Sequence, residues 1–158
     1  MTGYTLGTAS LAELQGVHPL IVGVVRRAIQ ITEQDFGVHD GLRTEAEQRA
    51  YVQRGVSQTM NSKHLRQPDG WGHAVDLVPW IAGRMRWEWP AIYPIAHAMQ
   101  AAARLEGVTI RWGGCWRHLD SIPEGEAELL RAVEAYGAAR RRARKPAFTD
   151  GPHYELVL

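Results

Sequence analysis

Two histidines and two carboxylates stand in two distant segments of the chain, in a pattern typical of a catalytic metal site. Ser62-Lys63-His64 is followed by Gly72-His73-Ala74-Val75-Asp76, and Asp150-Gly151-Pro152-His153 stands near the C-terminus. Imidazole and carboxylate both bind zinc, and catalytic zinc sites use three protein ligands and keep one position open. His64, Asp76 and His153 would supply the ligands and leave Asp150 free to transfer protons. The pattern predicts a metal-dependent hydrolase, although each residue taken alone is typical of an ordinary surface or strand position.

Periodicity and capping signals predict the elements that must position these residues. Thr44-Glu45-Ala46-Glu47 is a capping box that opens a helix ending at Gly55. The other expected helices cover residues 19–32, 90–106 and 124–144, and the expected strands cover 36–42, 74–78, 108–112 and 153–158. This order favours an α+β fold, a small and mostly antiparallel sheet with flanking helices and a zinc cleft at the sheet. A single catalytic domain over 1–158 is expected, with a long helical insert at about 121–147.

Composition narrows the class of protein. The chain has 158 residues, enough for one domain with a core of its own, and 18 basic residues nearly balance 17 acidic ones. This balance gives no general electrostatic reason to expect nucleic-acid binding. A single cysteine, Cys115, excludes an intramolecular disulfide framework. Residues 1–6 show no signal peptide, and the apolar runs are too short for stable insertion into a membrane.

The motifs resemble a known family of zinc peptidases, the D-alanyl-D-alanine carboxypeptidases and L-alanyl-D-glutamate endopeptidases, and among them the single-domain phage endolysins. The resemblance rests on Ser62-x-His64, Gly72-x-Ala74-x-Asp76 and Asp150-x-x-His153. Further motifs occur in family order, namely Gly16-Val17-His18-Pro19, Gly41-Leu42-Arg43-Thr44, Gly55-Val56-Ser57-Gln58-Thr59, Trp112-Gly113-Gly114 and Pro152-His153-Tyr154-Glu155. The likeness covers almost the whole chain and implies the fold shared with the hedgehog signalling domain.

The resemblance implies a role for each site residue. His64, Asp76 and His153 become the zinc ligands, and Asp150 becomes the general base that also returns a proton to the leaving amine. Arg43 becomes a group that steadies an oxyanion or a substrate carboxylate, with a surface ion pair as the alternative. Ser62 stands where the family has a small hydroxyl. Among the tryptophans, Trp71 or Trp116 is expected to line the cleft, and Trp116 is our choice for substrate binding.

Three features depart from the family pattern. Residues 65–71 lengthen the loop between the first histidine and the aspartate, and we expect them at the rim of the site. Cys115-Trp116 follows the Trp-Gly-Gly motif where Asp-Trp is common, so Cys115 is either a buried thiol or a soft metal ligand. The third departure is the helical insert, which has no obvious catalytic residue and ends in the basic run 140–145.

The expected function is hydrolysis of the L-Ala–D-Glu bond in peptidoglycan by a phage endolysin. D-Ala–D-Ala carboxypeptidase or dipeptidase activity is the alternative within the same chemistry, and a non-catalytic zinc-binding interaction domain is the alternative of another class. Peptidoglycan is the expected partner, with no nucleic acid and no stable membrane insertion, and the protein is expected to be a monomer. It is expected in the host cytoplasm before lysis and at the cell wall after release.

Overall fold

The structure, a computed structural model, describes residues 3–57 and 59–158, so Met1, Thr2 and Gln58 of the segments named above lie outside the described residues. Its helices are α1 (Thr8–Glu13), α2 (Pro19–Ile31), α3 (Glu45–Gln53), α4 (Trp89–Glu106) and α5 (Glu126–Arg142), with a short 3₁₀ helix η1 (Leu119–Ser121). Its strands are β1 (Phe36–Asp40), β2 (Ala74–Ile81), β3 (Arg84–Met85), β4 (Thr109–Trp112) and β5 (His153–Val157). The predicted α+β class is confirmed.

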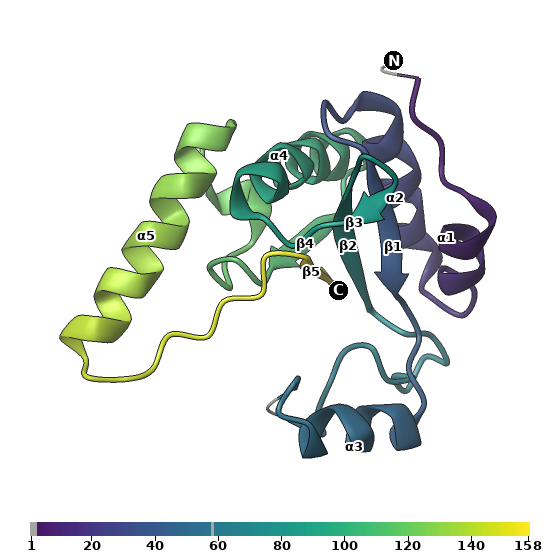
Figure 1. The fold of residues 1–158 in the computed structure, drawn as a ribbon, viewed down its shortest axis with the longest axis horizontal. Helices are drawn as coiled ribbons and strands as arrows, with labels where there is room; N and C mark the ends of the chain where they lie inside the picture. Colours follow the sequence, from purple (N-terminus) through teal and green to yellow (C-terminus); the bar gives the residue numbers. More distant parts are fainter. Residues whose placement is uncertain (1–2, 58) are drawn as a thin grey trace.

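The strands form one antiparallel sheet, which lies at the centre of the molecule (Figure 1). Its order is β1-β2-β5-β4, and β3 pairs with the far end of β2. The C-terminal strand β5 is therefore inserted between β2 and β4, so the last element of the chain lies beside the strand that carries Asp76. This topology brings the two halves of the predicted site together.

One face of the sheet is apolar and packs against α2 and α4. Alternate residues of a strand point to opposite faces, and Val75, Leu77, Tyr154 and Leu156 belong to the hydrophobic core with the buried sides of these two helices. The residues that alternate with them, which include Asp76, His153 and Glu155, point to the other face. The same strands thus supply the core on one side and polar groups on the other.

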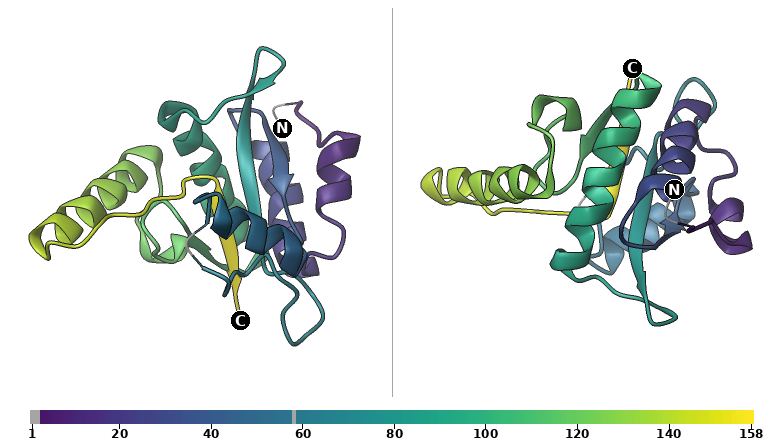
Figure 2. Two further views of the ribbon diagram at one scale, coloured as in Figure 1. Left: turned by 60° about the horizontal axis from the view of Figure 1, so that its bottom comes forward. Right: turned by 90° about the horizontal axis from the view of Figure 1, so that it is seen from above.

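The helix α5 leaves the rest of the molecule as an arm, and the chain returns along it to β5 (Figures 1 and 2). Leu129 and Ala132 near its start are buried, and the helix packs mainly on α4. Its last turn carries Arg140, Arg141 and Arg142. The helix α5 is therefore shorter than the predicted insert 121–147. After Arg142 the chain runs back to β5 without forming a helix or a strand.

Several element boundaries differ from the prediction. The helix α1 and the short strand β3 were not expected, and β2 continues past Val78 to Ile81. Pro79 is tolerated because β5 pairs only with residues 74–76, so its missing N–H interrupts no bond in that ladder. Within the described residues, no helix is both long and apolar enough to cross a membrane.

Candidate metal centre

Three neighbouring strands place acidic and imidazole groups in one row across the sheet. Asp76 of β2 lies opposite Asp40 of β1 on one side and opposite His153 of β5 on the other. Directly opposed residues of antiparallel strands share a face and have close side chains. The row is possible because the β1–β2 register shifts between Val38 and Asp40, which brings Asp40 level with Asp76.

His64 comes from a loop that backbone hydrogen bonds tie to its surroundings. The carbonyl oxygen of His64 accepts a bond from Arg43 N at 2.8 Å, and His73 N donates to Lys63 O at 2.7 Å. The hydroxyl of Ser62 accepts a bond from His64 N at 3.1 Å, which closes a local turn. The loop therefore holds His64 against the start of β2, next to Asp76.

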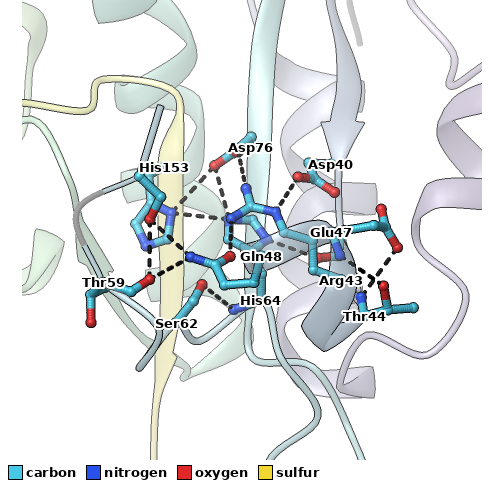
Figure 3. A network of polar contacts seen from close by, with 12 residues as sticks. Asp40, Arg43, Thr44, Glu47, Gln48, Thr59, Ser62, His64, Asp76 and His153 are labelled. Atoms are coloured by element: carbon cyan, nitrogen blue, oxygen red, sulfur yellow. Dashed lines mark hydrogen bonds and ion pairs between the residues drawn. The ribbon is translucent and has the colours of Figure 1, made fainter. Parts of the chain in front are cut away.

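The three predicted ligands form a nearly equilateral triangle (Figure 3). His64 Nε2 lies 3.2 Å from Asp76 Oδ1 and 3.3 Å from His153 Nδ1, and His153 Nδ1 lies 3.3 Å from Asp76 Oδ1. A tetrahedral ion with bonds of about 2.0–2.1 Å holds its ligand atoms about 3.3–3.4 Å apart. The three side chains are buried and already have the spacing that such an ion requires.

The outward-facing nitrogen of each histidine has its own acceptor. His64 Nδ1 donates to Gly41 O at 2.8 Å, and His153 Nε2 donates to Glu155 Oε1 at 2.9 Å. These bonds leave His64 Nε2 and His153 Nδ1 to face the centre. Metal-binding histidines typically donate their second N–H to a carbonyl or carboxylate, which fixes the ring orientation. The two histidines and Asp76 thus fit a divalent metal by the spacing of their ligand atoms, and the histidines also by the hydrogen bonds that orient their rings.

Charges in the centre favour ionised Asp76 and protonated His153 in the absence of metal. Burial would raise the pKa of Asp76, but His64 and His153 hold it well below its usual range. Burial lowers the pKa of His153, but its bonds to Asp76 and Glu155 outweigh this effect and raise the pKa to about 10. The surroundings of the triangle therefore favour a positive charge, and a bound cation would supply this charge in place of the proton on His153.

Arg43 is buried beside the triangle, so the ion pair expected as the alternative to its functional role is present, but it is buried and not at the surface. Its Nε donates to Asp40 Oδ2 at 2.5 Å, its Nη1 to Gln48 Oε1 at 2.6 Å and its Nη2 to Asp76 Oδ2 at 3.3 Å (Figure 3). All three guanidinium nitrogens thus have protein acceptors. Arg43 holds Asp76 by the oxygen that does not face the histidines.

Asp150 lies at the edge of the centre in a turn fixed by the Trp-Gly-Gly motif. Gly113 N donates to His153 O and Asp150 N donates to Gly113 O, both at 2.8 Å, and Trp112 Nε1 donates to Gly151 O at 2.7 Å. A side chain at position 113 would clash, since a Cβ there would lie 2.4 Å from Asp150 O. Burial, and then the charge of Asp76, raise the pKa of Asp150 to about 6. A carboxyl with this pKa suits proton transfer near neutral pH.

The centre opens into a cleft of ≈ 840 Å³, and the remaining predicted residues lie around it. Ser62, Trp116, Arg43 and Asp150 line this cleft, whereas Trp71 does not belong to its lining. Cys115 is buried in the hydrophobic core and is not part of the metal-binding group, and burial raises the pKa of its thiol. The structure therefore favours the buried-thiol alternative for Cys115.

The residues 65–71 lie to one side of the centre. His73 Nε2 donates to Asp69 Oδ2 at 2.6 Å, so this histidine binds the inserted loop and not the triangle. Lys63 is shared between the main cleft and a neighbouring hollow that Gln67, Pro68 and Asp69 line. The insertion therefore extends the rim beyond Lys63, as expected.

Three residues of the site were not singled out from the sequence. Gln48 is fully buried and links Arg43 to Ser57 Oγ and Thr59 O, and no local signal marks it. Glu155 stands two residues after His153, so strand alternation alone would have placed both on one face. Arg111 lines the cleft from β4, directly opposite Glu155, and only the strand register reveals this.

Comparisons with known proteins identify relatives of this chain. The model of a family described as phage L-alanyl-D-glutamate peptidase matches residues 2–133. The L-alanyl-D-glutamate peptidase of Escherichia phage T5 is 29% identical over 117 residues, which are 72% of this chain and 82% of that protein. The crystal structure of the Serratia marcescens L-Ala D-Glu endopeptidase ChiX matches with a TM-score of 0.69 and 35% identity. That match covers 98% of this chain and 92% of the other, and so extends beyond residue 133.

Proposed function

The chain belongs to the phage L-alanyl-D-glutamate peptidase family, and from this membership we propose that it is a zinc peptidase that hydrolyses the L-Ala–D-Glu bond of peptidoglycan stem peptides. The observation that carries the proposal is the triangle of His64 Nε2, Asp76 Oδ1 and His153 Nδ1, with Asp150 beside it. Three ligands and an adjacent free carboxyl are the arrangement of a hydrolytic centre, since a purely structural zinc site has four protein ligands.

Zinc fits the donor set because two imidazoles and one carboxylate lie at tetrahedral spacing. Zinc bound by His64, Asp76 and His153 would polarise a carbonyl and make water more acidic. Gly41 and Glu155 hold the two imidazoles in the tautomers that direct a free nitrogen to the centre. Arg43 holds the carboxylate of Asp76 in place, and this positioning is the role that we assign to it in the mechanism.

We assign the proton transfers to Asp150. Its carboxylate accepts a proton from the attacking water and then gives this proton to the nitrogen of D-Glu. Without the proton, this nitrogen would have to leave as a strongly basic anion, which is a poor leaving group. A pKa of about 6 places the group close to the pH at which both steps are balanced. Ser62 and Trp116 both line the cleft, and we propose that they contact the peptide.

The similarity to a phage T5 peptidase supports a role as a phage lysis enzyme. In this role the protein would act on peptidoglycan as its only macromolecular partner, as a monomer, and would reach the wall from the host cytoplasm at lysis. The match to a Serratia endopeptidase gives the same bond specificity in a second relative. Neither relative is named as a D-Ala–D-Ala carboxypeptidase.

The test is digestion of purified sacculi by the zinc-loaded protein, with products identified by mass spectrometry. New D-Glu amino termini that disappear after chelation and return with added zinc are expected. Release of D-alanine would assign the protein to the carboxypeptidase branch. Intact sacculi after digestion with the fully metal-loaded protein would leave only the non-catalytic zinc-binding alternative.

A further inference from the structure

The stem peptide has a chemical feature that the metal centre alone does not recognise. D-Glu is joined to L-Ala through its amino group and to the third residue through its γ-carboxyl group. Its α-carboxylate is therefore free and is attached to the same carbon as the scissile nitrogen. An enzyme that cuts this bond must accommodate a negative charge close to its own acidic residues, which include Asp76, Asp150 and Glu155.

Among the described residues, three arginine or lysine side chains line the cleft, and they differ in the contacts that they already make. Arg43 is buried, and bonds from all three of its nitrogens to Asp40, Gln48 and Asp76 already fix its guanidinium beside the metal centre. Lys63 is exposed, and within the described residues its ammonium makes no hydrogen bond or ion pair. Arg111 is intermediate, because it is fixed at one end and free at the other.

Arg111 is fixed by Trp116. Its Nε donates to Trp116 O at 3.0 Å, and its guanidinium carbon lies 5.1 Å from the centre of the Trp116 ring. Neither Nη1 nor Nη2 donates a hydrogen bond within residues 3–57 and 59–158, and the side chain is 42% exposed. The contact of Nη1 with Glu155 Oε2 is 3.7 Å long, beyond a hydrogen bond. Both terminal NH2 groups of Arg111 therefore remain available to a ligand.

Trp116 is itself held rigidly next to the centre. The centroid of its ring lies 5.6 Å from the ring centroid of His153 and 6.1 Å from that of Phe148. Its Nε1 donates to Phe148 O at 2.7 Å. Its backbone has φ 61°, a left-handed conformation that is unfavourable for a tryptophan. The tight turn after β4 enforces it, since Trp116 N donates to Trp112 O at 2.7 Å. Strained backbone of this kind is concentrated at functional sites.

We propose that Arg111, supported by the ring of Trp116, is a specificity residue that binds the α-carboxylate of D-Glu. The inference rests on the proposed L-Ala–D-Glu activity and adds how the bond is chosen. Arg111 of β4 lies opposite Glu155 of β5, and Glu155 accepts a hydrogen bond from His153. Arg111 is therefore on the strand next to the one that carries His153. A guanidinium with two parallel donors is the group that matches a carboxylate best.

The experiment compares two synthetic peptides, acetyl-L-Ala-γ-D-Glu-L-Lys-amide and the same peptide with the α-carboxylate of D-Glu replaced by a carboxamide. The ratio of their kcat/KM values is the readout, because metal loading and proton transfer affect both substrates alike. The wild-type protein is expected to favour the acid by about tenfold or more, since hydrogen bonds between charged partners are the strong ones. Arg111→Gln should bring the ratio close to one.

Matched variants separate this role from general effects of charge. Arg111→Lys keeps the charge without the paired donors and should retain part of the preference. Arg131→Gln removes an exposed arginine from α5 and should keep the wild-type ratio. Lys63→Gln should keep most of it, and a ratio that falls for Lys63→Gln but not for Arg111→Gln would overturn the assignment to Arg111.

Other outcomes are equally informative. A third peptide, with the α-carboxamide and a free C-terminal carboxylate, tests the other source of negative charge; an Arg111-dependent preference confined to it would overturn our assignment. If the wild type cleaves the acid but its ratio is unaffected by Arg111→Gln, this inference fails and the proposed function stands. If the wild type cleaves neither peptide, the proposed function fails. Should Arg111→Gln be inactive, calorimetric binding of the product γ-D-Glu-L-Lys-amide and of its α-carboxamide gives the same ratio without turnover.

Discussion

At the scale of single residues, the site separates groups that face the centre from groups that hold them. Asp76 shows the division most clearly, because Oδ1 faces the two histidines and Oδ2 accepts a bond from Arg43. Each histidine likewise uses one nitrogen inward and one outward. Asp150 belongs to neither group, since its carboxyl lies beside the triangle without being one of its corners.

Replacement of Asp150 by alanine should therefore abolish hydrolysis without loss of metal. We expect kcat/KM on a stem peptide to fall by about 10²–10⁴-fold, the contribution of a positioned acid–base group. Zinc content, measured by mass spectrometry after gel filtration, should stay at one per chain. His153→Ala is the comparison, and it should lose zinc and activity together. Normal turnover in Asp150→Ala would disprove the assignment of the base.

Asp150 should also make a contribution to the stability of the metal-free protein that is present at acidic pH and lost at alkaline pH. Burial raises its folded pKa to about 6, above the ordinary value of 3.8, so its favourable contribution is complete below about pH 3.8 and is lost as pH rises through 6. The variant Asp150→Asn has no such charge. With chelator present, its thermal midpoint should exceed that of the wild type at pH 8, and the difference should shrink toward pH 4. A constant difference across this range would contradict the raised pKa.

At the scale of elements, the turn after β4 aligns the turn before β5. Gly113 exchanges two backbone hydrogen bonds with the 150–153 segment and has no room for a side chain. The sequence motif Trp-Gly-Gly is thus explained by close approach of two backbones next to a ligand and a base. The capping box of Thr44 has a similar role, because it starts α3 where Gln48 reaches Arg43.

Gly113→Ala should consequently displace Asp150 and His153 together. We expect zinc affinity to fall by about tenfold or more, as for other changes that misorient a ligand, and activity to fall with it. Competition with a chelating dye would measure the affinity. Gly23→Ala is the matched control, since a Cβ at position 23 in α2 meets no atom within 4 Å; its zinc affinity should be unchanged and its stability equal or higher. Equal affinities in the two variants would show that the turn does not set the site.

At the scale of the whole molecule, α5 carries a basic last turn at the end of the arm (Figure 2). Arg141, Arg142 and Lys145 are exposed there, and none of them lines the cleft. Such a cluster stabilises the helix end by its interaction with the helix dipole. It would also attract the protein to an anionic cell-wall surface, and this attraction would weaken with salt.

Changing Arg141, Arg142 and Lys145 to glutamine should separate the two kinds of substrate. The rate of hydrolysis of a small soluble peptide should stay within about twofold of that of the wild type. These three side chains do not line the cleft, and salt screens their charges from a substrate bound in it. The rate on intact sacculi at low salt should fall, and its dependence on salt should become weaker. The measurement is the initial rate on both substrates between 20 mM and about 300 mM salt, which spans Debye lengths from about 20 to 6 Å. An unchanged salt dependence on sacculi would show that the cluster only caps α5.

The sequence by itself determined the candidate ligands and most elements. Ligand types, the Asp150-x-x-His153 spacing, the capping box at Thr44 and the periodicity of α2 are local patterns, and the structure brings the three expected ligands together with Asp150 beside them. The antiparallel α+β fold was also predicted correctly. Such features are readable because they depend on residues close together along the chain.

Only the tertiary structure decided which groups meet. The opposition of Asp40, Asp76 and His153 depends on the register of three strands, and β5 reaches its place from the far end of the chain. The same register sets the positions of Asp40 and Asp76, which together with Gln48 accept hydrogen bonds from Arg43. The pairing of β4 with β5 likewise places Arg111 opposite Glu155. A shift by one residue would turn these side chains to the other face, so no pattern within one segment specifies their partners.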